Sequence, residues 1–192
     1  MGAERYVRFT VIGWCFLWGV VCCSTSQAAR KPPTAPERPA VPDETSLKAA
    51  RSSVREMLGL GPKLTVKDPQ ITVDKLLRTG KGTKKDPAGR YACFELALKI
   101  ATDAKSPSMV LDAAGEIAEN FKVSPVKFKG DALTALARKI RSKSAAPEMA
   151  GAYEGLLIEA IAADDFAQAD KAVAGAKRFA ALSKDSVMLR RL

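Results

Sequence analysis

The chain has 192 residues, of which 47% are hydrophobic and 27% charged, and its net charge is +10. This charged content argues against an integral membrane protein, and the length suits one domain of ordinary size. No histidine occurs in the sequence, which excludes histidine-based acid–base catalysis and histidine metal sites.

Residues 1–28 have the pattern of a secretory signal peptide. Arg5 and Arg8 precede the uncharged run of residues 9–29, whose first part is strongly apolar. The small residues Ser26 and Ala28 suit a signal peptidase, so we expect cleavage after Ala28. The predicted location is therefore exported, either periplasmic or secreted. An uncleaved N-terminal membrane anchor is the alternative, although the apolar part is short for a bilayer span.

The cysteines fit the same interpretation. Cys22 or Cys23 offers a second alternative, lipidation, although the residue before each cysteine is larger than lipidation sites usually have. After cleavage only Cys93 would remain, so we expect neither an internal disulfide nor a thiolate metal cluster. Cys93 lies between Tyr91 and Phe94 in a helical pattern and is predicted to be a small core residue.

Residues 29–45 are predicted to be a proline-rich disordered linker. Five prolines occur in residues 30–45, with almost no bulky apolar residue. Such a composition cannot bury enough apolar surface to fold.

Residues 46–85 form a basic segment with helical pattern. Together with the linker they give residues 30–85 an excess of 13 basic over 6 acidic residues. This excess favours contact with an anionic surface, either lipid or acidic polysaccharide. The side chains that would make it are Lys63, Lys67, Lys75, Arg78, Lys81, Lys84 and Lys85.

The later prolines mark the start of successive helices. They fall at positions 69, 87, 107, 125 and 147, which are 18, 20, 18 and 22 residues apart. Proline is favoured in the first turn of a helix, where its missing N–H costs nothing. The residues before four of them are good N-caps, namely Asp68, Asp86, Ser106 and Ser124.

Apolar residues recur at helical spacing after each of these prolines, and no stretch alternates as a strand would. We predict seven helices, including one over 46–58, one over 69–78 that Gly80 ends, and one that begins near Asp164 or Asp165. The expected fold is all-α: antiparallel hairpins stacked as a short tetratricopeptide-like α-solenoid, or an irregular bundle. Residues 86–185 would form this domain, and 186–192 a tail.

The core is expected in the C-terminal half, because all seven aromatic residues outside the signal follow residue 90. Ile161 and Phe166 are included in the predicted apolar helix faces. Net charge alternates along this half: −3 for residues 106–121, +6 for 122–143, −6 for 144–170 and +5 for 171–192. We expect neighbouring helices to attract one another through these charges.

Two resemblances accompany this pattern. Residues 164–185, with the helix before them, resemble a degenerate tetratricopeptide-type helix pair, although Leu157 and Ala160 replace the usual glycine and tyrosine. The residues that carry this likeness are Leu156, Ala169 and Ala176, with Tyr153 and Val173 as substitutes of similar size.

Residues 46–185 also resemble helical regions of exported planctomycete-type bacterial proteins of unassigned function. The matching residues are Asp86, Pro87, Ala88, Arg90, Tyr91, Ala113, Ile117, Phe121, Val123, Lys129, Asp131, Ala132 and Leu133. This likeness implies a helical interaction module and supplies no catalytic residues.

No residue set points to an enzyme. Ser124 and Lys127 have the S-x-x-K spacing of some acyl-transfer enzymes, but no partner motif follows, and an N-cap with a solvated lysine explains them. We therefore predict a non-enzymatic protein-interaction or scaffolding module of the cell envelope, without cofactor or metal. Its partner would be an envelope protein, with an anionic surface as the alternative and nucleic acid not expected.

Overall fold

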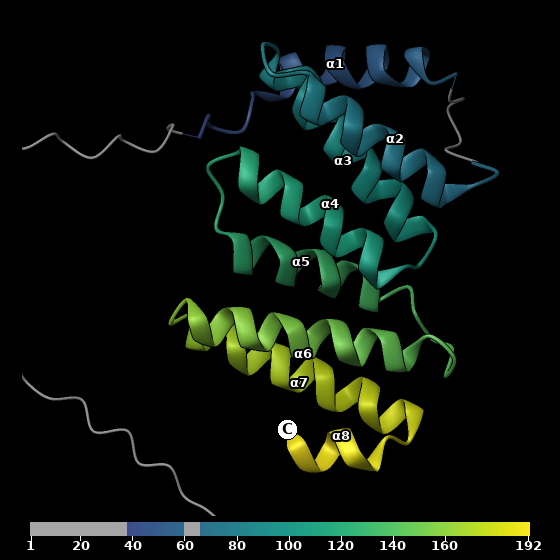
Figure 1. The fold of residues 1–192 in the computed structure, drawn as a ribbon, viewed down its shortest axis with the longest axis vertical. Coiled ribbons are helices and arrows are strands. Elements are labelled where there is room, and N and C mark those ends of the chain that lie inside the picture. The colour runs from purple at the N-terminus through teal and green to yellow at the C-terminus, as the bar shows by residue number, and fades with distance from the viewer. Residues whose placement is uncertain (1–37, 60–65) are drawn as a thin grey trace, which may run out of the picture. The chain divides into compact units, whose positions relative to one another are not determined.

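Eight α-helices occur in residues 38–59 and 66–192, the part of the chain that this computed structural model describes (Figure 1). No strand occurs in these residues. The helices are α1 (Glu44–Met57), α2 (Pro69–Gly82), α3 (Pro87–Asp103), α4 (Pro107–Asn120), α5 (Pro125–Ala137), α6 (Ala146–Ala162), α7 (Phe166–Ser183) and α8 (Ser186–Arg191).

The helix starts predicted at the prolines are confirmed. A proline is the first residue of α2, α3, α4 and α5, and Pro147 is the second residue of α6. The carboxylate of Asp68 accepts a hydrogen bond from the Ile71 N–H at 3.1 Å, and that of Asp86 from the Gly89 N–H at 3.0 Å. Ser106 and Ser124 occupy the N-cap positions with extended backbone, but their side chains make no capping bond.

Consecutive helices run antiparallel and pack against one another, as Figure 1 shows from α2 to α8. Second neighbours also touch: α2 contacts α4, α4 contacts α6, α1 contacts α3 and α5 contacts α7. Short connections force this arrangement, because the chain must reverse direction after every helix. The predicted all-α fold of stacked antiparallel helices is confirmed.

Helix α3 lies inside the stack, since α1, α2 and α4 all pack on it. Its buried side chains point in several directions rather than along one stripe, as expected of a helix inside a core. They are mostly small, which lets the neighbouring helices come close: Ala92, Cys93, Phe94, Leu96, Ala97, Ile100 and Ala101. The burial of Cys93 confirms its prediction as a core residue.

Helix α2 extends beyond the end predicted for it. It continues through Gly80 to Gly82. A Cβ atom on Gly80 would lie 2.4 Å from Cε1 of Phe94, so the missing side chain makes room for this ring. Gly80 is therefore a site of close approach between α2 and α3 instead of a helix end.

The pair α6 and α7 has the most extensive contact between helices. The Tyr153 ring of α6 stacks on the Phe179 ring of α7, with centroids 6.0 Å apart and an interplanar angle of 16°. Tyr153 also covers Gly175, where a Cβ atom would lie 2.7 Å from the ring. The two aromatic side chains and the glycine thus set the spacing of this pair.

Both ends of the described chain differ from the sequence prediction. Helix α1 begins at Glu44, inside the segment predicted as linker, because Asp43 caps it. The Arg38 guanidinium donates to the Ala118 carbonyl at 2.8 Å, and the Lys122 N–H donates to the Pro39 carbonyl at 2.9 Å. Residues 38 and 39 are thereby attached to the end of α4.

Residues 186–191, predicted as tail, form the short helix α8. It packs on α7 through Met188, and Asp185 caps it by accepting from the Val187 and Met188 N–H groups. Residues 38–59 and 66–192 all belong to one compact unit, so helices α1 and α2 of the basic segment belong together with the helices after them.

Ion pairs between helices occur where the alternating charges predicted attraction. Lys129 of α5 pairs with Glu159 of α6 at 2.7 Å, and Arg191 of α8 pairs with Glu154 of α6 at 2.6 Å. Such exposed pairs contribute about 0–1 kcal/mol each to the free energy of unfolding. They therefore influence which helices pack together more than they stabilise the fold.

The prediction that Phe166 lies on the apolar face of its helix is wrong. Phe94, Phe121 and Phe179 are fully buried, but Phe166 is 65% exposed. Ile161, also predicted to lie on an apolar helix face, is 53% exposed. On regular helices, both residues lie roughly 100° around the axis from the centre of the buried face. The spacing of apolar residues in the sequence was therefore not enough to show that they are exposed.

We predict that Gly175→Ala destabilises the protein although alanine is the better helix former. The added methyl group meets a Tyr153 ring that Phe179 holds in place, and such overpacking costs about 1–3 kcal/mol. Gly155→Ala on the exposed side of α6 is the control, because nothing lies within 4 Å of its Cβ position. That substitution should stabilise by about 0.5–1 kcal/mol. Urea unfolding of both variants measures the difference, and equal stabilisation would contradict the packing described.

Candidate functional site

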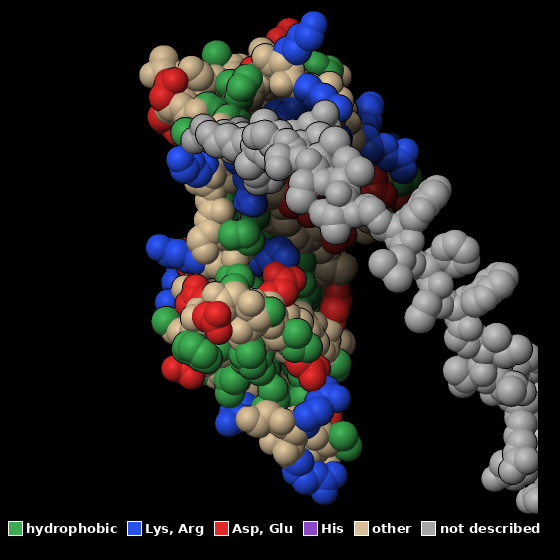
Figure 2. Space-filling view, turned by 60° about the vertical axis from the view of Figure 1, so that its left-hand side comes forward, with side chains coloured by type: hydrophobic (Ala, Val, Ile, Leu, Met, Phe, Trp, Pro, Cys, Tyr) green, Lys and Arg blue, Asp and Glu red, His purple; other side chains and the backbone are tan. Residues whose placement is uncertain are grey.

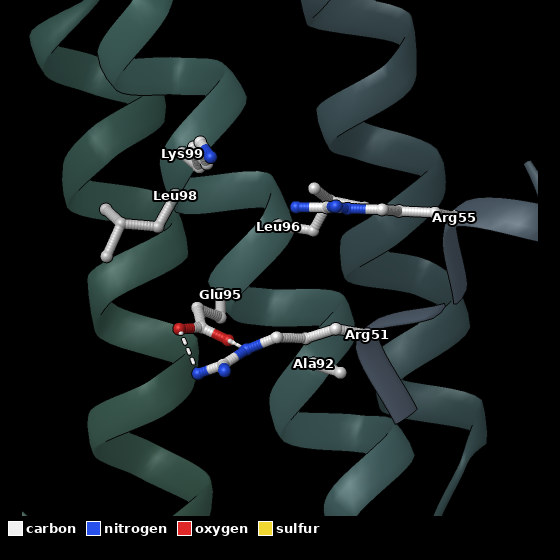
Figure 3. A pocket seen from close by; sticks show the side chains of 7 residues that line it. All are labelled: Arg51, Arg55, Ala92, Glu95, Leu96, Leu98 and Lys99. Atoms are coloured by element: carbon white, nitrogen blue, oxygen red, sulfur yellow. Dashed lines mark hydrogen bonds and ion pairs between the residues drawn. The ribbon is translucent and has the colours of Figure 1, made fainter. Parts of the chain in front are cut away.

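A cleft of about 460 Å³ lies between α1 and α3 (Figure 3). Helix α1 supplies two arginines, Arg51 and Arg55, and α3 supplies the rest of the lining. The α3 residues are Ala92, Glu95, Leu96, Leu98 and Lys99. The cleft combines an apolar wall with charged side chains, as ligand sites of proteins commonly do.

A bidentate ion pair between Arg51 and Glu95 lies in one part of the cleft. The Arg51 Nε donates to Glu95 Oε2 at 2.6 Å, and Nη2 donates to Oε1 at 2.8 Å. Arg51 also pairs with Glu44. These two carboxylates raise the pKa of the Arg51 guanidinium above its usual value, chiefly through the Glu95 hydrogen bonds. The charge of Arg51 is therefore used within the protein, where it holds α1 against α3.

The remaining cations of the cleft have no carboxylate partner among the described residues. Arg55 extends from α1 toward Leu96 (Figure 3), and its Nε is buried without a hydrogen bond. Lys99, one turn after Glu95 on α3, is exposed and makes no ion pair. An unsatisfied buried donor costs about 1–3 kcal/mol. Arg55 and Lys99 thus carry the positive charge of this cleft that no described carboxylate neutralises.

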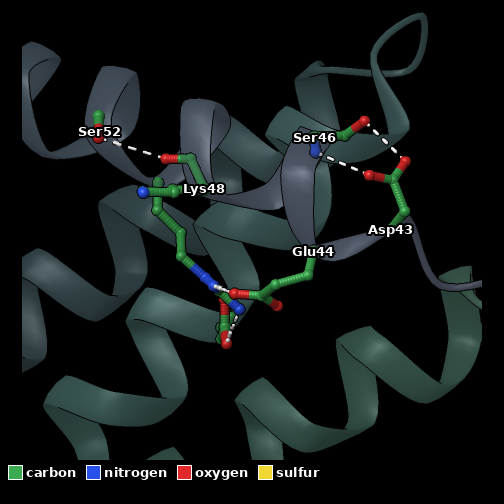
Figure 4. A network of polar contacts seen from close by, with 7 residues as sticks. Asp43, Glu44, Ser46, Lys48 and Ser52 are labelled. Atoms are coloured by element: carbon green, nitrogen blue, oxygen red, sulfur yellow. Dashed lines mark hydrogen bonds and ion pairs between the residues drawn. The ribbon is translucent and has the colours of Figure 1, made fainter.

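The start of α1 is fixed by a small polar network (Figure 4). The Asp43 carboxylate accepts from the Ser46 N–H at 2.9 Å and from its hydroxyl at 2.8 Å. These bonds to the charged form lower the pKa of Asp43 below its ordinary value of 3.8. One turn farther on, the Ser52 hydroxyl donates to the Lys48 carbonyl. The network orients the helix that carries Arg51 and Arg55.

A second candidate surface lies at the turn between α6 and α7. Ile158 and Ile161 of α6 and Phe166 of α7 are 64%, 53% and 65% exposed. We call these three residues the apolar patch. The turn lies at the left of Figure 1, and Figure 2 shows hydrophobic and acidic side chains gathered in the lower half of that side. Exposed large apolar side chains that gather in this way mark interaction sites.

Acidic residues surround the apolar patch. Glu159 is paired with Lys129, and Asp165 caps α7 by accepting from the Gln168 N–H at 3.1 Å. Asp164 has a left-handed backbone with φ of 54° and is exposed, as is Asp170. Neither of these two carboxylates has an ion pair within residues 38–59 and 66–192.

The predicted anionic-surface residues do not form one cluster with the cleft. Lys63 lies outside the described residues, and the other six are all exposed. Lys81 pairs with Glu116 of α4 at 2.6 Å, and this carboxylate raises the pKa of Lys81. Lys75 and Arg78 lie on one face of α2 with the exposed Ile71. Lys67, Lys84 and Lys85 flank that helix.

The predictions for the N-terminus lie outside the described residues. They include the signal peptide, its cleavage after Ala28 and the alternatives at Cys22 and Cys23. Within the described part, no helix combines the length and apolar character that a membrane crossing requires. No group of three metal-ligating side chains occurs there either. Ser124 and Lys127 are both exposed.

Sequence reasoning missed the cleft and the apolar patch. Arg51 and Glu95 are 44 positions apart, so their pairing depends on how α1 packs on α3. The exposure of Ile158 was open to prediction, because it lies roughly 150° from the buried face of α6 when placed on a regular helix. No protein-family model matches the chain, and no curated protein or solved structure is significantly similar to it.

Proposed function

We propose that the chain is an exported, non-enzymatic helical-repeat module that binds a protein partner in the cell envelope. The observation that supports this function is the apolar patch of Ile158, Ile161 and Phe166 on the α6–α7 turn. The proposal includes the tetratricopeptide-like character of this helix pair and the likeness to exported planctomycete-type helical regions.

The energetics of the apolar patch favour a protein partner. Complete burial of one large apolar side chain contributes about 1.5–3 kcal/mol, so three such side chains supply much of what a specific interface needs. The turn belongs to the most extensively packed helix pair, which presents these residues on a rigid base. Rigid surfaces lose little conformational freedom on binding.

The acidic surroundings indicate the chemistry of that partner. Asp164 and Asp170 are exposed beside the apolar patch and have no ion pair among the described residues. A partner with an apolar segment flanked by lysine or arginine would complement both features. The charges would guide encounter more than they add affinity.

The export part of the proposal depends on residues 1–28. Arg5 and Arg8, the apolar run and the small residues before the cleavage position after Ala28 support it. A retained N-terminal anchor would place the same helical unit at a membrane surface and leave the proposed contact unchanged.

Site-specific photo-crosslinking in intact cells tests the protein-binding function. A photoreactive residue at position 158 should give a defined crosslinked protein, and the matched position 71 should not. Ile71 is the control because it is equally exposed, at 65% against 64%, on a different helix. Phe166→Ser should reduce the crosslink at least tenfold, because the partner loses one of three apolar contacts.

Two outcomes would reject the proposal. One is equal crosslinking from positions 158 and 71, which would indicate nonspecific proximity. The other is a crosslink at position 158 that Phe166→Ser leaves unchanged. Circular dichroism of each variant establishes that the helical unit remains folded, which is expected because the side chains at positions 71, 158 and 166 are all exposed.

The alternative function is binding to anionic lipid or acidic polysaccharide through residues 30–85. One observation favours it: Ile71, Lys75 and Arg78 share an exposed face of α2, and neither cation has an ion pair among the described residues. Basic and apolar side chains on one helix face are typical of contact with a membrane surface.

Cosedimentation with vesicles tests this alternative. Binding to vesicles with anionic lipid should fall several-fold between about 0.1 and 1 M salt, because the Debye length shortens from about 10 to 3 Å. Lys75→Gln combined with Arg78→Gln should weaken it, whereas Lys105→Gln on the α3–α4 turn should not. Binding that is insensitive to salt, or equal on neutral vesicles, would exclude anionic lipid as the ligand.

A further inference from the structure

The α1–α3 cleft contains an excess of positive charge that no described residue neutralises. Arg51 forms ion pairs with two carboxylates, Glu44 and Glu95, so the net charge of these three groups is −1. Arg55 and Lys99 add two positive charges, which leaves the cleft and its edge at +1. Both cations line the same cleft, so an anion bound there would reduce their mutual repulsion.

The geometry of Arg55 adds to this imbalance. Its Nε is buried and makes no hydrogen bond with any described residue. Burial of Nε limits how the guanidinium can turn, so its terminal amino groups stay directed across the cleft from α1 toward α3 (Figure 3). A planar guanidinium in such a position matches the two oxygens of a carboxylate or phosphate.

The other part of the lining is apolar. Ala92, Leu96 and Leu98 of α3 face the same space as the two cations. The cleft volume of about 460 Å³ falls in the range of small-molecule sites, which extends from about 300 to 1,000 Å³. The ligand that fits therefore has an anionic head and a short apolar group.

We propose that the α1–α3 cleft binds a small amphiphilic oxyanion, a carboxylate or phosphate that carries a short apolar group. Arg55 and Lys99 bind the oxygens, and Ala92, Leu96 and Leu98 contact the apolar group. Arg51 positions the site, because its pair with Glu95 fixes α1 against α3. This inference is independent of the protein-binding function proposed for the apolar patch.

Octanoate and octyl phosphate are the probes, with octanol and octylamine as matched compounds of the same chain length. We expect the two anions to bind the full chain at least tenfold more tightly than octanol, and octylamine to bind weakest. Isothermal titration calorimetry measures the affinities. Methyl NMR locates the site, with shifts at Leu96 and Leu98 and none at Leu133, which is buried on α5.

Variants of the two free cations complete the test. Lys99→Gln and Arg55→Gln should each weaken octanoate binding at least tenfold, and Lys105→Gln outside the cleft should leave it unchanged. If Arg55→Gln fails to fold, Lys99→Gln alone still tests the proposal, because Lys99 is exposed and its substitution leaves the core intact.

The two anions distinguish the possible sources of the ligand. Preference for octanoate assigns a carboxylate, and preference for octyl phosphate assigns a phosphate ester. Octanol that binds as tightly as both anions would overturn the proposal, because apolar contact alone would then explain binding. Methyl shifts that spare Leu96 and Leu98 would also overturn it.

Discussion

The packing of α1, α2 and α4 around α3 is the constraint on which the rest of the structure depends. Alanine at positions 92, 97 and 101 lets three helices approach one axis closely, and Gly80 makes room for the Phe94 ring. Close packing of small side chains leaves little free space, so a change of one methyl group is felt. Helix α1 packs with Leu47 and Val54 buried, and the Arg51–Glu95 pair adds a polar contact to α3 at which the cleft opens.

The two candidate surfaces belong to different parts of the stack. The cleft lies between α1 and α3, and the apolar patch lies on the turn between α6 and α7. Stacked helices contact only their near neighbours in sequence, so surfaces on separate pairs can serve separate ligands. A small oxyanion near α1 and a protein partner at α6–α7 would therefore be compatible.

Local chemistry made the helix starts predictable from the sequence. Asp68 before Pro69 and Asp86 before Pro87 act as N-caps whatever packs on them, and the structure shows both bonds. Features that depend on a second helix were not predictable in this way. Gly80 appeared to be a helix end because Phe94, which covers it, comes from the next helix.

The same limit applies to the candidate sites. Arg55 and Lys99 are ordinary surface cations in the sequence, and only the packing of α1 on α3 brings them to one cleft. Phe166 was predicted to lie on the apolar face of its helix, yet it lies beside the buried face of α7 and is exposed. Which side chains are buried depends on how the helix is rotated about its own axis. A short pattern of apolar residues defines this rotation poorly.

Native-state hydrogen exchange tests the central role of α3 most directly. If three helices enclose it, the amides of residues 92–101 should exchange only through global unfolding, with a free energy equal to that from urea unfolding. Amides of α1 and α8 should exchange with lower free energies, because fewer neighbours cover them. Exchange in α3 that is as fast as in α1 would contradict the account.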